Sequence, residues 1–205
     1  MVRSFDGTPV DLDWLDELCA VALWAPSAGN SAGVRMHTIG HELVPRYFEV
    51  ATDEAWRQSA RRAPGLQRAG AIVLVTARPQ DYLARYAEPD KFSSGLHESA
   101  AWPLPYWHAD AAMATLALLL LIEEDGWQAT LWGNFRHGSD VLSWAHVEDE
   151  TLFGAILVGR GDGNDVASQS LSRNVPPRAQ RVRRVEITPS QPSRQPPGTP
   201  RSFER

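Results

Sequence analysis

The stretch Trp24-Ala-Pro-Ser-Ala-Gly-Asn-Ser-Ala-Gly33 separates a predicted helix from a predicted strand. Its proline disfavours the helical conformation for Ala25, while Gly29 and Asn30 tolerate a positive φ angle. The backbone can therefore turn sharply here and direct its N–H groups outward. Such a stretch is either a plain connecting loop or a segment that holds a ligand.

Helices and strands alternate on both sides of this stretch. Asp11 is expected to cap a helix that runs to about Leu23, with Leu15, Leu18 and Ala22 on one face. A short strand at 34–39 follows the stretch. The other expected elements are a helix at 41–58 broken near Pro45, a buried strand at 71–76, a helix at 81–86, a helix at 111–125 capped by Asp110, strands at 128–131 and 152–158, and a short helix at 139–145.

A long loop is expected at 87–105, because this segment carries glycine, prolines and serines without periodicity. It closes with an aromatic cluster made of Trp102, Tyr106 and Trp107. The helix that follows is apolar on nearly every side, so it is predicted to be central. Loops of this length often cover functional sites.

Composition narrows the class of protein. The 205 residues favour one domain at 1–187, followed by a disordered tail at 188–205 that is rich in proline and serine. The formal charge of −5 argues against a nucleic-acid partner. The single cysteine, Cys19, lies on an apolar helix stripe and excludes a disulfide framework. We expect a cytoplasmic protein without a membrane partner, since no signal segment or membrane-spanning run is present.

Several short motifs give little evidence of a functional site. The six histidines form no cluster with ligand spacing, so we expect no metal site. His137-Gly-Ser-Asp140 contains the residue types of a hydrolase triad, but triads are assembled across a fold. Gly159-Arg-Gly-Asp-Gly163 lacks the full dinucleotide fingerprint. The run 168–173, with Arg178 beyond it, could hold a phosphate or could be a solvated polar loop.

Taken together, five segments resemble the FMN-dependent nitroreductase family, and most of all the nitroreductase-like oxidoreductases of high-GC bacteria. The match covers about residues 2–187. It rests on Arg3-Ser-Phe5 with Pro9-Val10, on Ala25-Pro-Ser-Ala-Gly-Asn-Ser31, on Arg85-Tyr-Ala-Glu-Pro-Asp-Lys91, on Pro105-Tyr-Trp107 with Asp110, and on Gly133 after a strand. The resemblance implies an α+β fold, a nitroreductase-like α/β/α sandwich with a central mixed, mainly antiparallel sheet. It also implies a homodimer with two flavins at the subunit interface.

The resemblance also assigns the cofactor and its contacts. FMN is the implied cofactor and NAD(P)H the implied co-substrate. The opening stretch would lie against the flavin ring system and hydrogen-bond its pyrimidine edge, which explains why the helix stops there. This group is Pro26, Ser27, Ala28, Gly29 and Asn30.

Three further groups follow from the same resemblance, and no catalytic acid or base is among them. The loop Trp132-Gly133-Asn134 would present a backbone N–H to flavin N5, and Arg3 with Ser4 would contact the phosphate. Arg173 is the candidate for a second basic phosphate ligand. The aromatic residues Trp102, Tyr106 and Trp107 either cover the flavin face or pack the core.

The sequence departs from the family pattern in three places. Arginines that precede the position of Met1 in the family are not in this sequence, Ala32 stands where glutamine is frequent, and Ala112 stands where glycine is usual. Each hydrogen bond to a charged phosphate contributes roughly 1.5–3 kcal/mol. Weakened FMN binding is therefore an open alternative.

The implied function is an FMN-dependent NAD(P)H oxidoreductase. It would reduce small aromatic acceptors of the nitroaromatic or quinone type by ping-pong hydride transfer through flavin N5. Two alternatives stay open: a specialised FMN-dependent oxidase or dehydrogenase of secondary metabolism, and a degenerate, non-catalytic member with weak flavin binding.

Overall fold

The computed structural model describes residues 1–134 and 136–185. The chain forms two compact units, Met1–Val166 and Ala167–Arg205. The helices and strands that build the sheet and its two cores all belong to the first unit. The predicted disordered tail at 188–205 lies outside the described residues, and the single domain at 1–187 stays a prediction.

The centre of the first unit is a four-stranded sheet in the order β1-β2-β4-β3, with every neighbouring pair antiparallel in the described chain. All seven residues of β2 are buried, as its continuous apolar run predicted. The sheet thus confirms the α+β class and the mainly antiparallel expectation. The strands are β1 (Val34–Gly40), β2 (Ala71–Ala77), β3 (Gln128–Trp132) and β4 (Thr151–Gly159).

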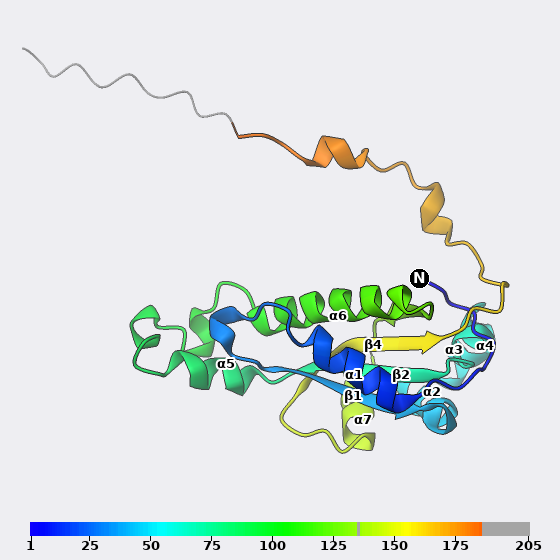
Figure 1. Cartoon of the computed structure of the whole chain (residues 1–205), viewed down its shortest axis with the longest axis horizontal. Helices are drawn as coiled ribbons and strands as arrows, with labels where there is room; N and C mark the ends of the chain where they lie inside the picture. Colours follow the sequence, from blue (N-terminus) through cyan, green and yellow to red (C-terminus); the bar gives the residue numbers. More distant parts are fainter. Residues whose placement is uncertain (135, 186–205) are drawn as a thin grey trace, which may run out of the picture. The chain divides into compact units, whose positions relative to one another are not determined.

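Helices cover both faces of the sheet, which gives the α/β/α sandwich (Figure 1). On one face, α1 and α6 contribute Leu15, Cys19 and Leu118 to a buried cluster that includes Val73 of the sheet. On the other face, α2 and α7 pack on a second cluster. The helices are α1 (Leu12–Ala22), α2 (Val44–Ala51), α3 (Glu54–Ser59), α4 (Ala63–Leu66), α5 (Pro79–Tyr86), α6 (Tyr106–Glu124) and α7 (Gly138–Trp144).

One predicted helix start is wrong and one predicted helix has a further break. The break expected near Pro45 is confirmed, since the 3-10 turn His41–Leu43 ends where α2 begins and proline is compatible with the first turn of α2. A second break lies at Thr52, because Asp53 caps α3 by accepting from the Trp56 N–H. Helix α6 begins at Tyr106, so Asp110 lies inside it and caps nothing. The expected cap of α1 is confirmed, since the Asp11 side chain accepts from the Asp13 N–H.

The described part of the second unit, residues 167–185, contains two short 3-10 turns, Gln169–Ser172 and Arg178–Arg181. In neither unit does a described helix combine the length and the apolar character needed to cross a membrane.

Candidate functional site

The stretch after α1 forms a tight loop that contains one 3-10 turn, Ala28–Asn30. Gly29 has a φ angle of 63°, and Asn30 and Ala32 have φ angles of 56° and 49°. Ala32 is strained by this, because its Cβ crowds the backbone in the left-handed region. The Ser27 hydroxyl accepts from the Ala32 N–H at 3.0 Å and holds the turn closed.

A buried carboxylate fixes this loop to the body of the protein. Asp110 is 1% exposed, and its Oδ2 accepts from the Ala28 N–H at 2.8 Å and from the Tyr82 hydroxyl at 2.9 Å. Burial raises the pKa of the Tyr82 hydroxyl, and the hydrogen bond to Asp110 raises it further. The Ala28 N–H, which was predicted to face the flavin together with its neighbours, is thus directed at Asp110.

The other Asp110 oxygen, Oδ1, is buried without a hydrogen-bond partner among the described residues. Asp110 lines a cavity of about 200 Å³ under the loop, together with Pro26 and Ser27. Only one carboxylate oxygen therefore holds the loop.

A side chain of α5 holds the tip of the loop in place. Arg85 donates from Nε to the Gly29 carbonyl at 3.0 Å, and its guanidinium forms a two-pronged pair with Asp90 at 2.8 Å for each bond. A Cβ at Gly29 would lie 2.8 Å from the Tyr86 ring. The loop is therefore shaped by residues on α5 and α6 rather than by its own sequence alone.

The predicted aromatic cover lies beside this loop. Trp102 packs edge-on against Tyr86, with 4.9 Å between ring centroids, and also contacts Tyr82 and Trp107. Its indole N–H donates to the Leu96 carbonyl at 2.7 Å. Trp102 and Trp107 are partly buried in this cluster, whereas Tyr106 is exposed. Whether they also cover a ligand stays a prediction.

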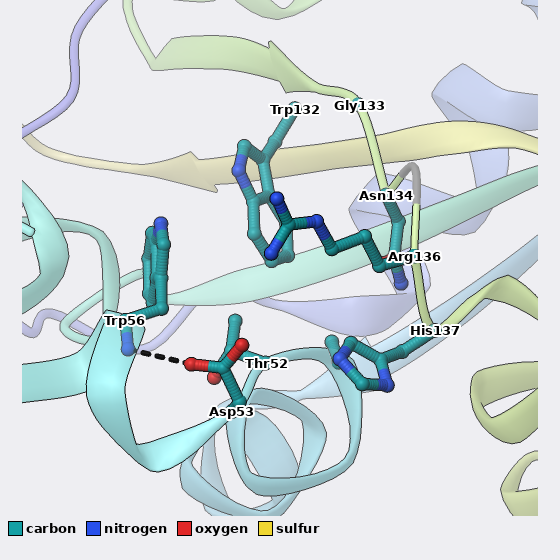
Figure 2. Close-up of a pocket in the computed structure, with 9 residues that line it drawn as sticks. Thr52, Asp53, Trp56, Trp132, Gly133, Asn134, Arg136 and His137 are labelled. Atoms are coloured by element: carbon teal, nitrogen blue, oxygen red, sulfur yellow. Dashed lines mark hydrogen bonds between the residues drawn. The ribbon is translucent and has the colours of Figure 1, made fainter.

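A second and larger cavity, of about 360 Å³, opens where β3 ends. Figure 2 shows the loop from Trp132 to Asn134 on one side of it and the end of α2 with the start of α3 on the other. Trp132 and Trp56 form aromatic walls, with 5.7 Å between their ring centroids. The lining residues are Ala51, Thr52, Asp53, Trp56, Trp132, Gly133, Asn134, Arg136 and His137.

This cavity carries one unpaired buried donor. The Asn134 side-chain Nδ2 has no hydrogen-bond partner among the described residues, although it is shielded from solvent. The amide faces the Tyr47 hydroxyl, which is also buried and unpaired in the described chain, but the two groups do not reach hydrogen-bond geometry. Burial raises the pKa of the Tyr47 hydroxyl, and the Asn134 amide lowers it in part. A buried donor without a partner costs free energy, and such groups usually serve a ligand or water. Asn134 is therefore suited to hydrogen-bond a polar atom of a molecule in the cavity.

The sequence did not identify the wall formed by Thr52, Asp53 and Trp56. Asp53 is occupied as the cap of α3, where its Oδ1 accepts from the Trp56 N–H at 2.7 Å. Thr52 donates its hydroxyl to the Phe48 carbonyl at 2.5 Å. These are ordinary helix-end contacts, so no local sequence signal distinguishes the three residues.

The segment around Arg3 and Ser4 lies at the opposite end of β3. Phe5, fully buried, forms an isolated bridge with Gly161 after β4 and fixes the segment. The Ser4 hydroxyl donates to Asp162 Oδ2 at 2.9 Å, and Arg68 pairs with the same oxygen. Arg3 forms no ion pair with any residue that the structure describes.

Apart from Arg173, the predicted site residues thus fall into separate places within the first unit. The loop at Pro26–Asn30 leads into β1, which is one edge of the sheet, whereas Trp132 ends β3, which is the other edge. Arg3 and Ser4 form a third group. Arg173 follows the first 3-10 turn of the second unit, and its assignment to a phosphate stays a prediction.

Comparisons with known proteins agree with this fold. Residues 1–160 match the Nitroreductase family. A nitroreductase-like protein from Streptococcus mutans aligns over 90% of this chain and 93% of its own, with 16% identity and a TM-score of 0.66. A nitroreductase family protein from Streptococcus pneumoniae covers 90% and 94%, with 18% identity and a TM-score of 0.62. A protein from Desulfovibrio desulfuricans, solved in complex with FMN, covers 91% and 92%, with 17% identity and a TM-score of 0.60.

At these identities, the structural likeness by itself demonstrates the shared fold. No curated protein matches the chain.

Proposed function

The chain belongs to the nitroreductase family, and we propose that it is an FMN-dependent oxidoreductase that uses NAD(P)H to reduce small aromatic acceptors of the nitroaromatic or quinone type. The observation that carries this proposal is the cavity at the end of β3. It combines two tryptophan walls with the unpaired Asn134 amide in the loop that the family resemblance assigns to the flavin.

The residues of this cavity fit a flavin ring system. Flat aromatic surfaces pack favourably against a planar heteroaromatic ring, and the Asn134 Nδ2 supplies a donor for one of its polar edges. Gly133 has no side chain, so its backbone N–H can approach a ligand closely. Trp132, Gly133 and Asn134 would therefore hold and orient the ring.

The residues at the other end of β3 fit a phosphate. Arg3 and Ser4 offer a guanidinium and a hydroxyl, and Arg68 adds a second guanidinium next to Ser4. We propose that Arg3 and Ser4 bind the phosphate of FMN, with Arg173 as a further ligand.

The loop at Pro26–Asn30 requires a second chain in this proposal. It lies at the β1 edge, across the sheet from the cavity, so we propose that it meets the cavity of the partner subunit in a homodimer. An exposed apolar stripe on α6 supports dimer formation, because Met113, Leu116 and Leu120 are 40%, 59% and 64% exposed.

When bound, FMN supplies the hydride chemistry at its N5 atom. The chain's own part is binding and orientation. Asn134 would fix the ring by a hydrogen bond, Trp56 and Trp132 would exclude water from one side, and Arg3 with Ser4 would anchor the phosphate. Both NAD(P)H and the acceptor would use the same open face in turn, which gives ping-pong kinetics.

The test is an absorbance spectrum of the purified protein with and without added FMN, followed by anaerobic titration with NAD(P)H. We expect a flavin spectrum that bleaches on addition of NAD(P)H and returns when a quinone is added. A protein that stays colourless after reconstitution would overturn the proposal. Sedimentation tests the dimer, since a stable flavin-loaded monomer would contradict it.

A second candidate is a family member with weak flavin binding and no turnover. One observation favours it, the carboxylate of Asp162 on the Ser4 hydroxyl, where the proposal needs room for a phosphate. A flavin affinity too weak for stoichiometric loading, together with no NAD(P)H oxidation by any acceptor, would select this candidate.

A further inference from the structure

A carboxylate of the chain itself, that of Asp162, already contacts Ser4, one of the predicted phosphate ligands. Asp162 Oδ2 accepts from the Ser4 hydroxyl and pairs with the Arg68 guanidinium. Its Oδ1 accepts from the Asn164 N–H at 2.8 Å. The two segments are also joined by the Asp162 N–H, which donates to the Ser4 carbonyl at 3.2 Å. Donors from three segments of the chain thus converge on one carboxylate.

The same donors suit a phosphate better than a carboxylate. A phosphate monoester carries up to two negative charges and three acceptor oxygens, so it can take the Ser4 hydroxyl and the Arg68 fork together. Arg68 is already oriented, because its Nε donates to the Phe5 carbonyl at 2.8 Å. Its side chain is 51% exposed, so an anion from solution can reach it.

A phosphate and the Asp162 carboxylate cannot both use these donors, since they would lie side by side as like charges. Asp162 can move away at modest cost. Its loop follows the end of β4, and its neighbour Gly163 has a φ angle of 78° with open space around it. The Asp162 side chain is 13% exposed and lies beside the half-exposed Arg68 guanidinium.

We propose that Ser4 and Arg68 form a binding site for the phosphate of FMN and that the Asp162 carboxylate competes with the phosphate for it. This inference rests on the proposed function and adds two residues to it, Arg68 as a phosphate ligand and Asp162 as an internal competitor. FMN binds by displacing Asp162 from Ser4 and Arg68. The chain therefore holds FMN less tightly than its donors alone would allow.

The test compares FMN with riboflavin, which has the same ring system and no phosphate. Apo-protein is titrated with each flavin, and the quenching of flavin fluorescence gives the two dissociation constants. The variant is Asp162→Asn, which keeps the size and one acceptor for Ser4 and removes the charge. Glu124→Gln, an exposed substitution at the end of α6, is the control for the same change in net charge.

We expect Asp162→Asn to bind FMN about tenfold more tightly, because removing a screened like charge next to a phosphate has an effect of that order. Riboflavin affinity should not change, and Glu124→Gln should affect neither flavin. An FMN affinity that is unchanged or weaker in Asp162→Asn would overturn the inference. An equal gain for riboflavin would overturn it as well, since the effect would then not involve the phosphate.

Arg68→Gln tests the other half of the proposal. It should weaken FMN about tenfold and leave riboflavin unchanged, because only the charged fork is lost. Melting temperatures of the apo-proteins identify any variant that is misfolded. Equal FMN affinity in a folded Arg68→Gln variant would exclude Arg68 as a ligand.

Failure of this inference is distinguishable from failure of the proposed function. Wild-type protein that binds FMN but responds to neither substitution leaves the function intact and refutes the competitor. Wild-type protein that binds neither flavin refutes the function. In that case inorganic phosphate still tests the site, since it should raise the melting temperature of Asp162→Asn more than that of wild type, and an equal shift would overturn the inference.

Discussion

Two carboxylates organise two regions that the sequence assigned to the cofactor, and they do so in different surroundings. Asp110 holds the loop at Pro26–Asn30 from inside the protein and is 1% exposed. Asp162 holds Ser4 near the surface, and its Arg68 partner is half exposed. Each carboxylate accepts from a backbone N–H and from a hydroxyl.

Burial decides what each carboxylate can do. The Tyr82 hydroxyl that donates to Asp110 is fully buried, so losing the carboxylate leaves this donor unpaired and the loop without its support. The donors to Asp162 can reach water or another anion instead. Asp110 therefore fixes the conformation of the loop, whereas the Asp162 carboxylate can be replaced by another anion.

The largest expected effect is on stability at Asp110. Asp110→Ala should lower the free energy of unfolding by about 3 kcal/mol, because it removes the acceptor of the fully buried Tyr82 hydroxyl and of the half-buried Ala28 N–H. Asp110→Asn keeps one acceptor and should cost less. Urea unfolding followed by tryptophan fluorescence measures both. If Asp110→Ala lowered the free energy of unfolding no more than Glu124→Ala, an exposed control, Asp110 would not be a structural support. The distinction between Asp110 and Asp162 would then be lost.

The next largest effect is expected on FMN binding, at the proposed phosphate ligands Arg3 and Arg173. Arg3→Ala and Arg173→Ala should each weaken FMN by roughly 1.5–3 kcal/mol, because each removes a charged donor to the phosphate. Lysine at either position should rescue binding in part, since it keeps the charge and loses the planar fork. Isothermal titration of apo-protein with FMN gives the values, and Arg46→Ala, an exposed arginine on α2, is the control. Unchanged affinity in both alanine variants would remove these residues from the phosphate site.

The family and the fold class could be predicted from the sequence because their signals are local. An aspartate before an apolar stripe predicted α1, and the continuous apolar run at 71–76 predicted β2, and both are confirmed. Asp110 was misread as a helix cap for the same reason, since an acidic residue before an apolar run looks like one. Its true partners, Ala28 and Tyr82, lie 82 and 28 residues away and leave no local pattern.

The candidate site was predicted only in part. The loop from Trp132 to Asn134 was identified by resemblance, but the facing wall comes from Thr52, Asp53 and Trp56, whose own contacts are ordinary helix-end contacts. The pairing of Ser4 with Asp162 joins residues 158 positions apart. Only the antiparallel order of the strands brings these segments together, and sequence periodicity does not contain that order.

A substitution at Gly29 in the loop separates the cost of backbone strain from the cost of the contact with the Tyr86 ring. Gly29→Ala should lower the free energy of unfolding by about 1.5 kcal/mol, because alanine is strained at a φ angle of 63° and its Cβ would meet the Tyr86 ring. Gly95→Ala is the matched control, since Gly95 has a φ angle of 74° with open space around it. The difference between the two losses, measured by urea unfolding, reports the ring contact alone. Equal losses would mean that Tyr86 yields freely and does not shape the loop.

The smallest expected effect is on stability at Asp162. Hydrogen bonds from the Asn164 N–H and from Ser4, together with Arg68, hold the pKa of Asp162 below its ordinary value, against a smaller opposing effect of burial. A carboxyl group with a lowered folded-state pKa stabilises the protein above its unfolded-state pKa of about 3.9, and this contribution is lost as the pH falls through the folded-state value.

Asp162→Asn should therefore be slightly less stable than wild type at neutral pH, by far less than Asp110→Ala, because the Arg68 partner is half exposed and solvent screens the pair. The difference should shrink as the pH falls below about 3.9 and should vanish only when the pH is below the lowered folded-state pKa of Asp162. Thermal unfolding of both proteins across this pH range measures it. A loss at neutral pH as large as that of Asp110→Ala would mean that Asp162 is a structural support that FMN cannot displace.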